Sequence, residues 1–74
     1  MYTFHLLFRP EPEGGYTVLV PSLPGCLTWA ESIEDGKELI KEAIHVYLES
    51  VEKHSEKIHD DTESFYTSVN YDHV

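Results

Sequence analysis

Proline and glycine divide the first thirty residues into short alternating runs of apolar and polar positions. From residue 2 to residue 9 the large apolar side chains recur at every second position, a period typical of a half-buried strand. One face carries Tyr2, Phe4, Leu6 and Phe8, and the other carries Thr3, His5, Leu7 and Arg9. A polar breaker at residues 10–15 separates this run from Tyr16 to Val20, which is β-branched and aromatic. The two runs predict a β-hairpin.

A second breaker, residues 21–25, reads Pro-Ser-Leu-Pro-Gly. Neither Pro21 nor Pro24 has an N–H to donate to a sheet, and Gly25 tolerates a positive φ, so a tight turn is expected here. A third short strand, Cys26 to Ala30, should follow. The three strands are then expected to form an antiparallel meander.

The next segment has the period of a helix. Ser32 followed three residues later by Asp35 resembles a capping box, with Asp in place of the usual Glu. From Ile40 onward the apolar residues are spaced 3, 1, 3, 1 and 3 apart, as one face of a helix requires. Gly36 costs about 1 kcal/mol against Ala within a helix. It therefore lies either where the helix closely approaches the sheet or in a weak first turn, and the sequence leaves both alternatives open.

The last apolar run, Phe65 to Tyr71, again alternates with period two and predicts a fourth strand. The expected fold is therefore α+β in the order β-β-β-α-β, a single domain over residues 1–74. A right-handed crossover would place the fourth strand parallel to the first, and the helix would cover one sheet face only. On the other face we expect Leu7 and Leu19, together with Leu27 or Trp29.

Length and charge narrow the functional classes. At 74 residues the core is small, so a homo-oligomer, a dimer or tetramer, is expected. Fourteen acidic against five basic residues give a net charge of -9, which disfavours direct nucleic-acid binding and favours a basic partner. No apolar run is long enough to cross a membrane, and no secretory signal is recognisable. The single Cys26 also fits a reducing compartment, so a cytoplasmic location is expected.

Residues 15–26 read Gly-Tyr-Thr-Val-Leu-Val-Pro-Ser-Leu-Pro-Gly-Cys, a string that closely resembles the signature of the HicB-like antitoxins. Its characteristic positions are Gly15, Tyr16, Pro21, Pro24, Gly25 and Cys26. Thr28 and the segment from Ser32 to Tyr47 continue the family pattern at the family spacing, so the resemblance covers residues 2–53. Departures are Ala30 where glycine is common, Gly36 where alanine is common, and the large apolar pair at residues 39 and 40.

The resemblance implies a partial ribonuclease-H-like fold and a HicA toxin as partner. HicA toxins are small basic RNA-cleaving proteins, and HicB proteins inhibit them by binding over the catalytic surface. Many HicB proteins also have a C-terminal DNA-binding module. Residues 59–74 contain no Lys or Arg, so no C-terminal DNA-binding domain is expected here.

Catalytic and metal chemistry find little support in the residues. Active ribonuclease-H-like enzymes hold metal ions with a carboxylate on the first strand, and residues 2–9 contain none. The cluster His54, His59, Asp60 and Asp61 lacks a diagnostic ligand spacing and is interpreted as a solvated loop. Cys26 is interpreted as a small buried side chain. We therefore predict no enzyme activity, no catalytic residue, no metal site and no cofactor.

The candidate partner-binding residues are apolar groups of the open sheet face and acidic groups near two turns. They are Leu7, Leu19, Trp29, Glu11, Glu13, Glu31, Glu34 and Asp35. Trp29 has two alternatives, a core residue or an aromatic interface anchor. The leading functional hypothesis is an antitoxin that neutralises a ribonuclease toxin by binding. The alternative is an orphan regulatory or ligand-binding domain that associates with itself through the open face.

Overall fold

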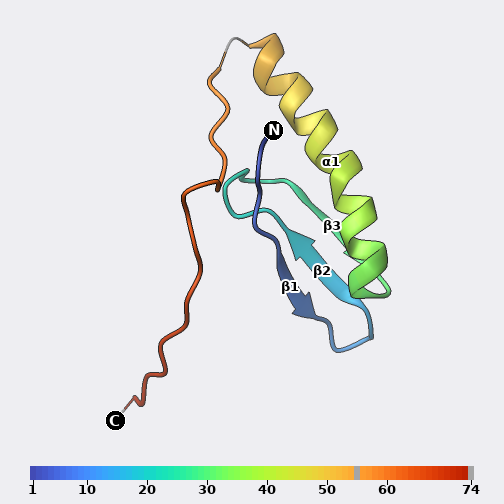
Figure 1. Ribbon diagram of the computed structural model, residues 1–74. Helices are drawn as coiled ribbons and strands as arrows, with labels where there is room; N and C mark the ends of the chain where they lie inside the picture. The colour runs from blue at the N-terminus through green and yellow to red at the C-terminus, as the bar shows by residue number, and fades with distance from the viewer. Residues whose placement is uncertain (55, 74) are drawn as a thin grey trace.

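Three short strands and one long helix form the body of the protein (Figure 1). The computed structural model describes residues 1–54 and 56–73. The strands are β1 (Leu7–Pro10), β2 (Tyr16–Leu19) and β3 (Leu27–Ala30), followed by the helix α1 (Ile33–Lys53). They form an antiparallel sheet in the order β1-β2-β3. The predicted meander is confirmed, with each strand shorter than its alternating run.

The strand register assigns the two sheet faces. Phe8, Val18 and Thr28 lie opposite one another across the three strands. This row faces α1, which covers one side of the sheet (Figure 1). Leu7, Leu19 and Leu27 form the neighbouring row, and alternation places their side chains on the opposite face. The prediction that the helix covers only one face is therefore confirmed.

The helix begins where the capping pattern predicts. Ser32 has an extended backbone, and its hydroxyl oxygen accepts the N–H of Asp35 at 3.1 Å. This bond satisfies one of the N–H groups that a helix leaves unpaired at its first turn. At the other end His54 donates its N–H to the C=O of Ser50 at 3.1 Å and ends the helix. The helix therefore closes at both ends with local hydrogen bonds.

The Pro-Gly turn connects β2 and β3 and also supplies core residues. Val20 donates its N–H to the C=O of Cys26 at 3.1 Å, and Leu23 and Cys26 close two tighter turns within the loop at 2.9 Å each. Gly25 takes a φ of +86°, which only glycine adopts at little cost. Leu23 and Cys26 are consequently buried beside Val18, Val20, Ala30 and Ile40. The signature residues of this turn have a structural role.

Gly36 lies at the closest approach of α1 to the sheet, which resolves the alternative that the sequence left open. It is buried, and a Cβ added there would lie 2.6 Å from the Phe8 ring and 2.9 Å from a methyl of Val18. Real Cβ atoms essentially never come so near other carbon atoms. The absent side chain at residue 36 therefore sets the distance between helix and sheet.

Gly36→Ala should lower the stability of the protein although alanine is the better helix former. The helical gain is about 1 kcal/mol, whereas overpacking at a buried contact costs about 1–3 kcal/mol. We expect a lower Tm in thermal unfolding followed by circular dichroism. Glu42→Ala, on the exposed side of the same helix, is the control and should change Tm little. A stabilised Gly36→Ala protein would contradict the close approach.

The structure differs from the sequence prediction after α1. Within the described residues, 62–73 form no strand, and every one of them is exposed. In Figure 1 this segment, coloured orange to red, leaves the body and extends away from β1. The predicted fourth strand over Phe65–Tyr71 is thus wrong for the isolated chain. The β-β-β-α-β order of a partial ribonuclease-H-like fold is not completed within the described residues.

Asp61 explains why the chain starts a parallel pairing and then abandons it. In a parallel ladder a residue donates its N–H to one residue of the neighbouring strand and accepts, at its C=O, the N–H two residues further along. Asp61 donates its N–H to the C=O of Thr3, but the N–H of His5 goes to the Asp61 carboxylate at 2.9 Å. The C=O of Asp61 instead accepts the N–H of Ser64 at 3.0 Å, closing a turn. The side chain has replaced the main chain in the ladder.

The Asp61 carboxylate is only 4% exposed and also accepts the hydroxyl of Ser22. Asp61→Ala would leave the N–H of His5 and the hydroxyl of Ser22 without this partner, at a cost of about 1–3 kcal/mol for a buried donor. Urea denaturation should show that loss. Asp61→Asn should lose less, because its oxygen still accepts one donor and the Ser22 hydroxyl turns to accept its amide.

Asp60→Ala provides the control for Asp61. Asp60 accepts the N–H of Thr3 at 2.9 Å in an exposed position, where water replaces the lost bond. We expect a change within about 0.5 kcal/mol for this surface substitution. Equal losses at both positions would contradict the role assigned to the buried carboxylate.

Candidate functional site: an open sheet face with an acidic end

The sheet face opposite α1 carries a continuous row of leucines. Leu7 pairs with Leu19, and Leu19 pairs with Leu27, so the row crosses all three strands. Leu7 and Leu27 are exposed, Leu27 by 55%, and Leu19 between them is half-buried. Aliphatic groups aligned on adjacent strands form one contiguous surface. The structure thus brings together two sequence-predicted contact residues, Leu7 and Leu19, and adds Leu27 to them.

Trp29 belongs to the same face, one row nearer to the β1–β2 turn. It lies opposite Thr17, which lies opposite Arg9. Its ring packs against Gly15, where φ is +73° and an added Cβ would meet the indole and lie 2.7 Å from the Ala30 carbonyl oxygen. The side chain is still 51% exposed. Trp29 is therefore a fixed surface aromatic rather than a core residue.

The acidic candidates gather at one end of the sheet. Tyr16 pairs with both Pro10 and Ala30, so the β1–β2 turn and the link from β3 to α1 lie at the same end (Figure 1). We call this group the acidic end, formed by Glu11, Glu13, Glu31, Glu34 and Asp35. All except Glu11 are exposed. It lies beside Trp29, next to the leucine row.

Three members of the acidic end also have local structural roles. Glu11 is half-buried and accepts the hydroxyl of Thr17 at 3.1 Å. Glu34 and Asp35 occupy the first turn of α1, where negative charge is favoured by the helix dipole. Glu13 and Glu31 have no such role in the described contacts. They are the members most available to a partner.

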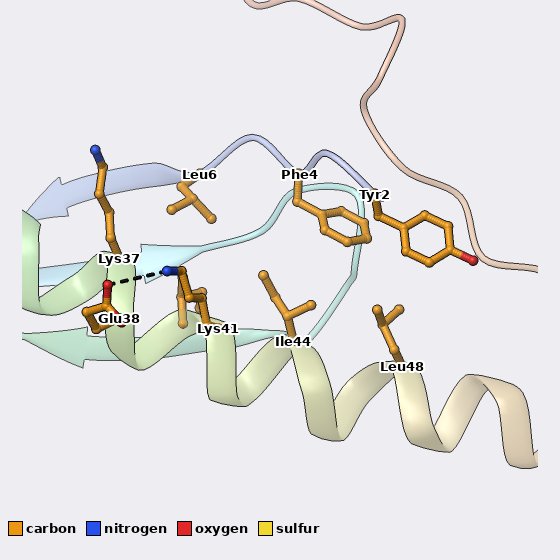
Figure 2. Close-up of a pocket in the computed structure, with 9 residues that line it drawn as sticks. Tyr2, Phe4, Leu6, Lys37, Glu38, Lys41, Ile44 and Leu48 are labelled. Atoms are coloured by element: carbon orange, nitrogen blue, oxygen red, sulfur yellow. Dashed lines mark hydrogen bonds and ion pairs between the residues drawn. The ribbon is translucent and has the colours of Figure 1, made fainter.

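A mainly apolar groove lies on the other side of β1. It has a volume of about 550 Å³ and runs between the N-terminal segment and α1. Figure 2 shows Phe4 and Leu6 on one wall and Ile44 and Leu48 on the other. Glu38 and Lys41, joined by an ion pair at 3.3 Å, lie at its rim. Its shallow form and apolar lining suit another protein segment rather than a polar substrate.

The histidine and aspartate cluster near residue 60 is used for packing contacts. The ring Nδ1 of His54 lies 2.8 Å from the C=O of Ser50, and Asp60 and Asp61 bind the N-terminal segment. Hydrogen bonds from the hydroxyl of Thr62 and the N–H of Thr3 lower the pKa of Asp60. Across residues 1–54 and 56–73, no three His, Cys, Asp or Glu side chains gather as a metal-binding group.

Cys26 is buried by 95%, being 5% exposed, and burial raises the pKa of its thiol. A raised pKa keeps the thiol protonated and unreactive at neutral pH. Its interpretation as a small core side chain is confirmed. None of the described helices combines the length and apolarity that a membrane crossing needs.

Two features of this surface escaped the sequence reasoning. Asp61 sits in a polar stretch that resembles a solvated loop, and only the Thr3 and His5 backbone gives it a function. The groove joins Phe4 to Ile44, residues forty positions apart, so no local pattern indicates it. The nearest sequence signal was Asp61 followed three residues later by Ser64, a pair typical of a polar turn.

Comparison with known proteins agrees with this architecture. A family model described as "HicB_like antitoxin of bacterial toxin-antitoxin system" matches residues 4–73. The chain belongs to the HicB-like antitoxin family. Membership implies an antitoxin role and, in general, a toxin partner. The resemblance carried by residues 15–26 is thus confirmed, and the match also includes the tail that follows α1.

Several curated relatives are UPF0150 proteins. One from Thermoplasma acidophilum is 42% identical over 55 residues, covering 74% of this chain and 80% of the relative. One from Archaeoglobus fulgidus is 48% identical over 46 residues, covering 62% and 67% respectively. A third, from Synechocystis, is 35% identical over 51 residues, covering 69% and 65%. The HicB-like antitoxin architecture is therefore similar to archaeal and cyanobacterial proteins.

Proposed function

We propose that this HicB-like protein neutralises a small basic HicA-type ribonuclease toxin by binding it directly in the cytoplasm. The observation that supports the proposal best is the open sheet face. Its leucine row and Trp29 form an apolar surface flanked by the acidic end. Such a combination is typical of a protein interface with a charged rim.

The two parts of the surface have different tasks in this proposal. Covering the leucine row and Trp29 removes apolar area from water and slows dissociation of the complex. The acidic end and the overall charge of -9 attract a basic toxin and speed association. The same charge repels RNA and DNA, so the proposed inhibition is occlusion of the toxin surface rather than competition for nucleic acid.

Inhibition of this kind requires no catalytic group in the antitoxin. It acts stoichiometrically, because each bound chain blocks one toxin surface. Co-expression with the toxin encoded by the adjacent gene is the direct test. Rescue of growth together with co-purification of the two chains would support the proposal, and a toxin that neither binds nor is neutralised would refute it.

Leu7→Glu/Leu27→Glu should weaken toxin binding by more than about tenfold, equivalent to 1.4 kcal/mol. Both side chains are exposed in the free protein, so the fold should persist, whereas the complex would bury two unpaired carboxylates. Isothermal titration calorimetry with purified toxin provides the measurement.

Leu39→Glu/Val46→Glu is the matched control. These are also exposed apolar residues and the charge change is identical, but they lie on the outer side of α1. Binding should stay within about threefold of the parent chain. If both pairs weaken binding equally, the loss reflects net charge and the open face is not the interface.

The alternative, an orphan self-associating domain, makes a different prediction for the same proteins. It expects no toxin binding at all, and a change of oligomeric state in Leu7→Glu/Leu27→Glu, since it assigns the open face to a second copy. Sedimentation of the free variants separates the two hypotheses.

A further inference from the structure

The C-terminal segment has the pattern of a strand but no neighbour in its own chain. Phe65, Thr67, Val69 and Tyr71 share one face by period-two alternation. Phe65 is 82% and Val69 89% exposed, as in an unfolded chain. Of residues 65–71, Tyr66 alone has a described contact with the body, a ring packed edge-on to His5 at 4.8 Å. An apolar β-face left in water is unfavourable and marks a surface that another molecule covers.

The outer edge of β1 offers unpaired main-chain groups. In the described part of the sheet β1 pairs with β2 alone. The hydrogen bonds Glu11 N–H to Gly15 and Val20 N–H to Cys26 fix the alternation of the ladder. They require Leu7 and Arg9 to bond β2, so the N–H and C=O of Phe8 point to the open edge. Such an edge is a template for an added strand.

The groove of Figure 2 borders the same edge on the helix side. A strand added beside β1 and the N-terminal segment would direct alternate side chains towards it. The apolar face of residues 65–71 supplies such side chains, and a seven-residue strand extends about 23 Å. An open edge, an apolar groove and an unpartnered alternating segment thus complement one another.

The chain's own tail is diverted from this edge. The turn closed by Asp61 and Ser64 leads residues 65–71 away from the body, while the buried Asp61 carboxylate holds that turn in place (Figure 1). We propose that residues 65–71 pair with the β1 edge of a second copy of this chain. The exchange is reciprocal, so two chains form a symmetric dimer in which each sheet gains a fourth strand.

This dimer interface is distinct from the open sheet face. It uses the edge of β1 and the helix side of the sheet, and leaves the row of Leu7, Leu19 and Leu27 exposed. The proposed toxin-binding surface therefore remains available in the dimer. Self-association and toxin binding then do not compete.

Val69→Asp tests the exchange, with Asn70→Asp as its matched control. The two positions are adjacent, both are exposed in the isolated chain and both variants add the same charge. They differ in the face of the tail on which the charge lies. By sedimentation equilibrium we expect a dimer for the parent chain and for Asn70→Asp, and a dissociation constant raised more than about tenfold for Val69→Asp.

Hydrogen exchange then locates the interface. In the parent dimer the amides of residues 65–71 and of Phe8 should be protected, and in Val69→Asp both should exchange fast. A parent chain that is monomeric with an unprotected tail would overturn the proposal. So would a monomer with a protected tail, which would show pairing within the chain, and a dimer with an unprotected tail, which would show another interface.

Discussion

The close approach of α1 to β2 at Gly36 is the contact on which the rest of the structure depends. With three strands of four residues each, the sheet needs a cover over Val18 and Val20, and one amphipathic helix supplies it. Because residue 36 has no side chain, Ile40 reaches the sheet and becomes almost fully buried. A chain of 74 residues with one such helix covers only one sheet face. The opposite face, with its leucine row, stays in water as a direct consequence.

A second constraint acts at the edge of the sheet. Asp61 binds the main chain of Thr3 and His5 and the hydroxyl of Ser22, so it joins the N-terminal segment, the Pro-Gly turn and the residues after α1. Buried carboxylates are stable only when such donors surround them. The cost is that the parallel pairing begun at Thr3 ends there, because the main-chain carbonyl of Asp61 is used in a turn. The edge and the tail are consequently both left unpaired.

The HicB-like fold thus presents two surfaces of different kinds. The open face displays side chains, which suits recognition of a particular partner surface such as a toxin. The β1 edge displays main-chain groups beside an apolar groove, which suits an extended strand of matching alternation. This division explains how a protein with so small a core associates through one surface and binds a partner through the other. The acidic end adds long-range attraction without being part of either apolar surface.

Local patterns in the sequence determined the three antiparallel strands, the capped start of α1 at Ser32, the Pro-Gly turn and the family. Each depends on residues close in the chain, where period, capping and turn chemistry act directly. The tertiary structure decided the role of Gly36, the partial exposure of Trp29 and the fate of residues 65–71. Alternation fixes which side chains share a face of a strand, but a strand also needs a neighbour with free main-chain groups. Whether the chain meets that neighbour depends on Asp61, whose partners lie more than fifty residues away.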